Sequence, residues 1–335
     1  MKRKLALVLM LSILLTALFS VPTAAAVDLT TIMQAKTHVT ADGYRLNYRI
    51  YVPENYSAEN KYPVLLFMHG AGSIGDDNKA QLNAGLPEAF NMSTCGIYDC
   101  IVIAPQCPTG NKWVDVSTWN DCSYSTDLIP ETDELKAVMD LLGTIKKTYS
   151  TDERRYYVTG LSMGGFATWD LITRHPDVFA AAVPVCGGAD YRKAELIKDM
   201  PIWTFHGLKD PTVPYTGTKK MVDELTALGA PNLKYTEFPE MQHDIWNTVY
   251  MSFMTWSWLF SKVKPEAPAE ETTTAVETTA PVATDGLTVE LPDVTTAEQT
   301  EETKGGCGST LGILPVGVFL AVAGLAMKRR REDEV

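Results

Sequence analysis

Apolar residues follow strand-like and helix-like spacings in alternation from residue 62 onward. The runs 62–69 and 100–104 are almost continuously apolar, as expected for strands buried on both faces of a sheet. Further strands are predicted at 155–159, 180–186, 201–206 and 233–238. Apolar residues at helical spacing predict helices at 131–149, 164–174, 214–228 and 244–262. This alternation indicates a mostly parallel sheet with helices on both faces.

Residues 37–52 come before this succession and alternate between apolar and polar side chains, as an antiparallel hairpin does. A hairpin that leads into a mostly parallel sheet is typical of the α/β-hydrolase fold, so we predict that fold. Residues 27–264 have the length of one such domain, and no internal repeat is visible.

The first 26 residues have the layout of a secretory signal peptide. A basic start at 2–4 is followed by an apolar stretch and then by small residues at 24–26. We expect cleavage after Ala26, so that the domain works outside the cytoplasm; an N-terminus retained in the membrane is the alternative.

Residues 265–306 have a composition unlike that of the domain. They hold eleven threonines, ten acidic residues against one lysine, and no aromatic residue. Such a segment buries too little apolar surface to offset the entropy of ordering it, so we predict a disordered stalk.

Residues 307–335 predict a C-terminal anchor. The apolar run 311–327 as a helix would span roughly 25 Å, slightly less than a bilayer core of about 30 Å. The basic cluster 328–331 that follows is typical of a cytoplasmic flank. The stalk and this tail resemble the C-terminal surface anchors of Gram-positive bacteria, so we expect an extracellular, cell-surface enzyme. A buried helix is the alternative, and processing or lipidation at Cys307 stays open.

The formal net charge of −12 is carried mainly by 265–306, and the domain is acidic as well. An acidic surface repels phosphate backbones, so we expect no nucleic-acid partner. The charge otherwise indicates only solubility.

Five cysteines lie in the domain. Cys95, Cys100, Cys107 and Cys122 could form two disulfides in an exported protein, or could be small apolar core residues. Cys186 lies in the apolar run 180–186 and is expected to be a buried, unpaired thiol. No Cys/His spacing is typical of a metal site, so no metal is expected.

The motif with the clearest chemistry is Gly160-Leu161-Ser162-Met163-Gly164, which fits G-x-S-x-G. It lies directly after a predicted strand and directly before a predicted helix, where this motif forms a tight turn that exposes the serine hydroxyl. We therefore predict Ser162 as the nucleophile.

A serine nucleophile needs a base and an orienting carboxylate, which follow it in this fold in the order acid, then histidine. His243 is the histidine that comes late enough, after the strand 233–238. Asp210 follows the strand 201–206 and is the predicted acid; Asp190, one strand earlier, is the alternative.

Acyl transfer also needs backbone donors for the oxyanion. The N–H of Met163 is one candidate, and the N–H of Ala71, in the loop after the strand 62–69, is the second. Gly70 and Gly72 are alternatives for the second donor.

Three tryptophans are candidates for lining the substrate pocket, since indole rings stack on sugars and aromatic acyl groups. Trp113 and Trp119 lie in the loop-like segment 107–130, and Trp246 follows the predicted base. Ordinary packing is the alternative for each.

Residues 37–262 resemble the secreted serine esterases often labelled predicted peptidases, relatives of the phospholipase/carboxylesterase, polyhydroxybutyrate depolymerase and feruloyl esterase branches. The resemblance rests on the segments 69–78, 104–108, 160–165, 206–214 and 243–246. It implies ester hydrolysis through an acyl-enzyme without a cofactor. The family pattern commonly has Glu-Arg where this chain has Ser73 and Ile74, so the mouth of the oxyanion loop departs from that pattern.

We therefore expect a carboxylesterase that acts on a small or polysaccharide-linked ester, such as acetyl or feruloyl groups of plant polysaccharide. A serine peptidase of the same fold is the alternative. A binding module on an inactive hydrolase scaffold is a more distant one.

Overall fold

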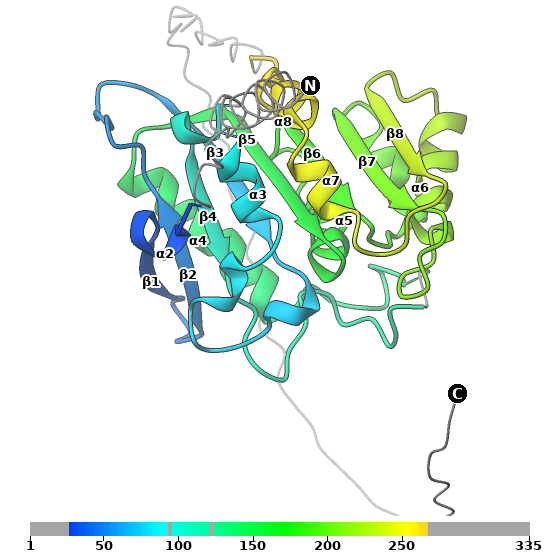
Figure 1. The fold of residues 1–335 in the computed structure, drawn as a ribbon, viewed down its shortest axis with the longest axis horizontal. Coiled ribbons are helices and arrows are strands. Elements are labelled where there is room, and N and C mark those ends of the chain that lie inside the picture. Colours follow the sequence, from blue (N-terminus) through cyan, green and yellow to red (C-terminus); the bar gives the residue numbers. More distant parts are fainter. Residues whose placement is uncertain (1–26, 93–95, 121–123, 267–335) are drawn as a thin grey trace, which may run out of the picture. The chain divides into compact units, whose positions relative to one another are not determined.

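A computed structural model of the protein describes residues 27–92, 96–120 and 124–266 (Figure 1). Its sheet has eight strands in the order β1-β2-β4-β3-β5-β6-β7-β8. The strands are β1 (Gln34–Val39), β2 (Arg45–Tyr51), β3 (Tyr62–Met68), β4 (Ile101–Pro105), β5 (Thr151–Leu161), β6 (Ala181–Val185), β7 (Ile202–Gly207) and β8 (Leu233–Phe238). β2 pairs antiparallel with β1 and β4, and the pairs from β4 to β8 are parallel. The predicted α/β-hydrolase fold with an antiparallel hairpin is confirmed.

Two hydrophobic cores lie on the two faces of this sheet, because successive side chains of a strand point to opposite faces. Val64 and Leu66 of β3 belong to one core, and Leu65 and Phe67 to the other. The first core is covered by α4 (Asp133–Thr148), α5 (Met163–Arg174) and α6 (Thr216–Ala227). The second is covered by α3 (Leu86–Asn91), α7 (Trp246–Tyr250) and α8 (Phe253–Phe260), which face the viewer in Figure 1.

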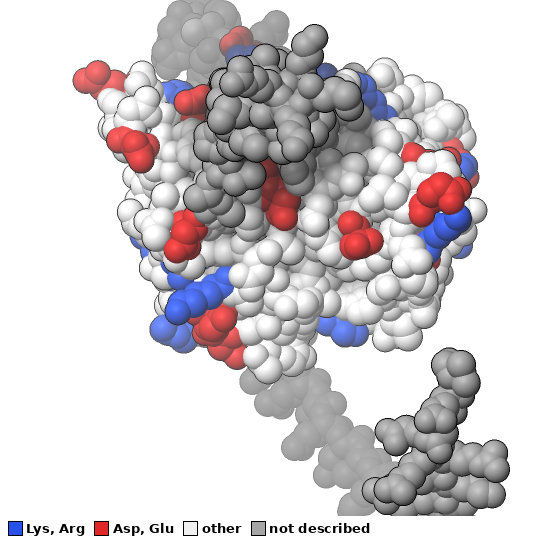
Figure 2. Space-filling view, in the orientation of Figure 1, with Lys and Arg blue, Asp and Glu red and all other residues white. Residues whose placement is uncertain are grey.

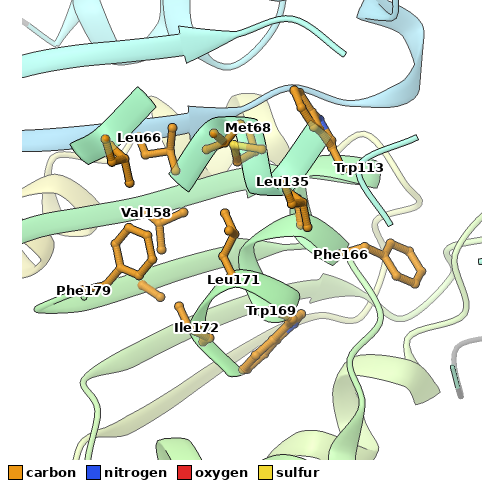
Figure 3. Close-up of a cluster of buried hydrophobic side chains, with 14 of the residues drawn as sticks. Leu66, Met68, Trp113, Leu135, Val158, Phe166, Trp169, Leu171, Ile172 and Phe179 are labelled. Atoms are coloured by element: carbon orange, nitrogen blue, oxygen red, sulfur yellow. The ribbon is translucent and has the colours of Figure 1, made fainter. Parts of the chain in front are cut away.

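Helix α5 is held by the first core. Leu171 and Ile172 of α5 point toward Val158 of β5 and Leu66 of β3, and all four side chains are fully buried (Figure 3). Burying an aliphatic side chain of this size contributes about 1.5–3 kcal/mol. The packing therefore fixes the start of α5, and with it the residue that precedes the helix.

The helix predicted over 131–149 is α4, which begins at Asp133 after a side-chain cap. The Thr132 hydroxyl accepts a hydrogen bond from the backbone N–H of Leu135, at 3.3 Å. The acidic Asp133 and Glu134 lie in the first turn, and the basic Lys146 and Lys147 lie in the last. The helix dipole favours negative charge at the first turn and positive charge at the last.

The segment 244–262 is two helices rather than the predicted single one. Ser252, between α7 and α8, has extended backbone angles. The break lets the rings of Tyr250 and Trp256 stack at 5.6 Å inside the second core, and the Trp256 indole donates to the Tyr250 carbonyl, at 2.7 Å. Hydrophobic spacing across residues 251–252 does not reveal such a break.

Several expectations fall outside the described residues: the signal peptide 1–26, the anchor 307–335 with Cys307, the stalk beyond residue 266, and Cys95 and Cys122. Within the part of the chain that the structure describes, no helix is long and apolar enough to cross a membrane. Cys107 and Cys186 are buried free thiols. The unpaired thiol expected at Cys186 is confirmed, and Cys107 is a core residue rather than half of a disulfide.

Candidate active site

Ser162 lies between β5 and α5 in a backbone conformation that few non-glycine residues adopt, with φ 55° and ψ −119°. The turn is tight enough to require glycine on both sides. A Cβ at Gly160 would lie 2.3 Å from the Gly164 carbonyl oxygen, and one at Gly164 would lie 1.9 Å from that of Met68. The G-x-S-x-G motif is therefore a steric requirement of this strand-to-helix turn and of its close packing on the end of β3.

Ser162 begins a chain of hydrogen bonds that joins the three residues predicted to act together. Its Oγ lies 2.8 Å from Nε2 of His243, and Nδ1 of His243 lies 2.7 Å from Oδ2 of Asp210. Asp210 follows β7 and His243 follows β8. Because the carboxyl ends of parallel strands meet at one edge of a sheet, residues distant in the chain converge there.

The Asp210 carboxylate is held by backbone groups as well as by His243. Its Oδ1 accepts the N–H groups of Thr212 and Val213, both at 2.9 Å. Burial by itself would raise the pKa of Asp210. Hydrogen bonds from His206, His243 and Val213 outweigh it and hold that pKa well below its usual range. Asp210 is therefore a carboxylate at neutral pH.

The alternative acid, Asp190, belongs to a different network. Its oxygens accept hydrogen bonds from the Thr126 backbone and hydroxyl and from the Arg192 guanidinium, at 2.6–2.9 Å. The hydrogen bond from His243 goes to Asp210. The geometry favours Asp210 over Asp190.

This arrangement prepares Ser162 for attack on an acyl group. Nδ1 of His243 faces a carboxylate and so carries the hydrogen, which leaves the lone pair of Nε2 directed at the Ser162 hydroxyl. A serine in this setting can pass its proton to the ring as it attacks a carbonyl carbon.

The two predicted oxyanion donors both lie at helix starts. Ala71 is the first residue of the short 3₁₀ helix η1 (Ala71–Ser73), and Met163 is the first residue of α5. The first N–H groups of a helix have no acceptor within it. Among the described residues, neither N–H has a hydrogen bond with a residue outside its own helix. Both remain available to an oxyanion.

A pocket of about 280 Å³ opens at Ser162. It is lined by Gly70, Ala71, Gly72, Ser73, Ala84, Trp119, Leu161, Ser162, Thr212, His243 and Trp246. None of these side chains except His243 can carry a charge near neutral pH. Uncharged residues also cover most of the molecular face shown in Figure 2, where acidic and basic groups are scattered. The pocket suits a neutral group.

Trp119 and Trp246 form part of the pocket wall, and the Trp246 ring meets the His243 ring edge-on at 5.5 Å. The prediction for Trp113 is wrong. Trp113 is fully buried beside Met68 and Leu135 (Figure 3), and its indole donates to the backbone carbonyl of His69, at 3.1 Å. A tryptophan in a loop can be fully buried when a neighbouring segment provides an acceptor for its indole N–H.

His69 supports the loop that carries Ala71. Its Nε2 accepts the backbone N–H of Cys107 at 2.9 Å, so Nδ1 carries the hydrogen and donates to the Gly70 carbonyl, at 2.7 Å. Burial lowers the pKa of His69 to about 4, which keeps the ring neutral at neutral pH. The neutral ring links the oxyanion loop to the chain after β4.

Four further residues line the pocket and were not among the predicted site residues: Ser73, Ala84, Leu161 and Thr212. Ser73, Leu161 and Thr212 could have been suspected, since each lies within two residues of a predicted one. Ala84 carries no local signal, because only the folding of its loop brings it to the pocket. No cluster of three or more His, Cys, Asp or Glu side chains in the described residues is arranged to hold a metal ion.

Comparisons with known proteins agree with this fold. The sequence profile of the phospholipase/carboxylesterase family matches residues 55–256. The chain is 26% identical over 166 residues to the bifunctional acetylxylan esterase/xylanase XynS20E of Neocallimastix patriciarum, covering 50% of this chain and 22% of that protein. It is 30% identical over 127 residues to poly(3-hydroxyalkanoate) depolymerase C of Paucimonas lemoignei, covering 38% of this chain and 28% of that protein.

The chain thus spans less than a third of each of these two relatives. Among solved structures, a thermostable esterase is 33% identical, with a TM-score of 0.63, and the match covers 70% of this chain and 64% of that one. The family profile matches more than half of the chain. The chain belongs to the phospholipase/carboxylesterase family of the α/β-hydrolase fold.

Proposed function

We propose that the protein is a serine carboxylesterase in which Ser162 is the nucleophile, His243 the general base and Asp210 the residue that orients the base. The observation that carries this proposal is the unbroken series of hydrogen bonds from Ser162 Oγ through His243 to Asp210, at 2.8 and 2.7 Å. The strained backbone at Ser162, which presents its hydroxyl to the pocket, also supports it.

The reaction proceeds in two halves. Ser162 Oγ attacks the ester carbonyl while His243 Nε2 takes its proton, and the N–H groups of Met163 and Ala71 donate to the oxyanion. His243 then protonates the departing alcohol, which leaves an acyl group on Ser162. In the second half a water molecule attacks the acyl-enzyme while His243 takes its proton, and His243 then returns that proton to Ser162 Oγ as the acid leaves.

The substrates are acetyl or feruloyl esters of plant polysaccharide. The pocket is small and free of permanent charge, which suits a neutral acyl group. Trp119 and Trp246 offer indole rings to an aromatic acyl group or a sugar. The similarity to a bifunctional acetylxylan esterase/xylanase is consistent with this substrate class.

The enzyme is exported and tethered to the cell surface through its C-terminal segment. The sequence features of 1–26 and 307–335 support this part of the proposal.

The test of the chemistry is Ser162→Ala, assayed on p-nitrophenyl acetate, methyl ferulate, acetylated xylan and aminoacyl anilides. We expect kcat on the esters to fall by a factor on the order of 10⁶, and labelling by an organophosphonate to disappear. Ser257→Ala, at an exposed position of α8, is the matched control and should keep wild-type rates. Full ester hydrolysis by Ser162→Ala would contradict the proposal. A wild-type enzyme that hydrolyses the aminoacyl anilides with a higher kcat/KM than the esters would favour a peptidase.

The test of location is protease treatment of intact cells that express the full chain. Cleavage in 267–306 should release active enzyme into the medium, because this segment lies outside the membrane in our proposal. Activity that stays with the cells and resists protease would contradict export.

A further inference from the structure

A second histidine contacts the Asp210 carboxylate, and the mechanism above does not use it. His206 lies in β7 and is fully buried. Its Nε2 lies 3.2 Å from Oδ2 of Asp210 and 2.9 Å from the carbonyl oxygen of Val213. Both neighbours are acceptors, so Nε2 carries a hydrogen and donates it.

The opposite edge of the His206 ring is fixed as well. Nδ1 lies 2.8 Å from Oγ1 of Thr218 in α6, and this hydroxyl lies 2.6 Å from the carbonyl oxygen of Gly187, just after β6. Thr218 is also fully buried. The ring is thus held between α6 and the end of β6, and it cannot turn without leaving buried polar groups unpaired, which costs about 1–3 kcal/mol for each.

These contacts complete the hydrogen bonding of Asp210. Oδ1 accepts two backbone N–H groups, and Oδ2 accepts the ring N–H groups of His243 and His206. Rotation of the carboxylate would break bonds on both oxygens at once. Without His206, Oδ2 keeps only the bond to His243, a partly exposed side chain that moves protons during the reaction.

We propose that His206 is a positioning residue for ester hydrolysis: by donating from Nε2 to Asp210, it keeps Oδ2 aligned with Nδ1 of His243 while His243 gains and loses its proton. This inference rests on the proposed roles of Ser162, His243 and Asp210. It adds that the site needs a hydrogen-bond donor at position 206, and that an apolar side chain of similar size does not replace it.

The experiment compares His206→Gln with His206→Leu in the full chain. Glutamine can place an N–H donor near the position of Nε2, whereas leucine fills space without a donor. Initial rates on p-nitrophenyl acetate are divided by the concentration of sites that an organophosphonate titrates to completion, so that unfolded protein does not count. We expect His206→Leu to lower kcat about 10- to 100-fold with KM within about two-fold, the effect of losing a hydrogen bond to a charged group. His206→Gln should restore most of kcat.

A third variant, Thr218→Val, keeps the side-chain shape and removes the hydroxyl that holds Nδ1. As a single substitution it should lower kcat about 3- to 10-fold. Combined with His206→Leu it should lower kcat little further, since both substitutions act through the ring at position 206. If His206→Leu does not fold, Thr218→Val alone decides, and a wild-type kcat in that variant overturns the inference.

Two other results would overturn it. One is a wild-type kcat per titrated site in His206→Leu, and the other is an equal loss in His206→Gln and His206→Leu, which indicates packing alone. The Ser162→Ala control separates the two proposals. If Ser162→Ala is inactive while His206→Leu is unaffected, only the role of His206 fails; if Ser162→Ala is active, the proposed function fails.

Discussion

Nε2 of His243 lies 2.8 Å from Oγ of Ser162, although 81 positions separate the two residues in the chain. Ser162 follows β5 and His243 follows β8, and β6 and β7 lie between these two strands. The loop after β8 must therefore cross the end of β7 to reach Ser162. Gly207 permits this crossing. A Cβ at Gly207 would lie 2.2 Å from the carbonyl oxygen of Gln242, the residue before His243.

Gly207→Ala should therefore displace the loop that carries His243. We expect kcat to fall about 100-fold, the effect of misplacing a catalytic group by about 1 Å, while KM changes less. Gly143→Ala, in α4, is the control, because nothing lies within 4 Å of a Cβ there. It should keep kcat and gain about 0.5–1 kcal/mol of stability. Steady-state kinetics and urea unfolding measure both effects.

Asp210→Asn should lower kcat by a factor on the order of 10⁴, because an amide no longer selects the tautomer that leaves Nε2 of His243 free. The comparison variant is Asp190→Asn, which weakens the contact with Arg192. It should lower the midpoint of thermal unfolding and leave kcat per titrated site near wild type. The reverse outcome, a large loss of kcat only in Asp190→Asn, would reject Asp210 as the acid.

Acid should destabilise the fold through His69. Its pKa is about 4 in the folded protein and 6.5 as the reference value, so between these pH values the unfolded chain binds a proton that the folded chain excludes. Stability is then lost as pH falls from about 6.5 to 4, by up to about 3 kcal/mol. His69→Gln cannot take up this proton, so its urea-unfolding free energy should fall less over the same range. Equal pH slopes in the two proteins would contradict this role.

Trp119→Ala and Trp246→Ala should change the preference between acyl groups. We expect kcat/KM for methyl ferulate, relative to p-nitrophenyl acetate, to fall about 3- to 10-fold, the contribution of one aromatic contact. Trp113→Phe is the control. It removes the hydrogen bond to the His69 carbonyl and should reduce stability without changing this ratio. A shift of the ratio in Trp113→Phe alone would show that the pocket wall is misassigned.

The sequence alone was enough to predict the eight strands, the helices α4, α5 and α6, the turn at Ser162, and the partners Asp210 and His243. These features have local causes. Side-chain alternation and helical spacing act within a few residues, and a Cβ at Gly160 would meet the Gly164 carbonyl within the turn itself. The order of serine, acid and histidine then follows from the order of the strands.

Other features were decided only by how the folded chain packs, and hydrophobic spacing does not reveal them. Trp113 and Trp119 lie in the same loop, yet Trp113 is buried against His69 while Trp119 lines the pocket. The break between α7 and α8 depends on the stacking of Tyr250 on Trp256. The contact of His206 with Asp210 depends on the turn after β7. Burial and hydrogen-bond partners of this kind are set by the packing of whole elements, which no short stretch of sequence encodes.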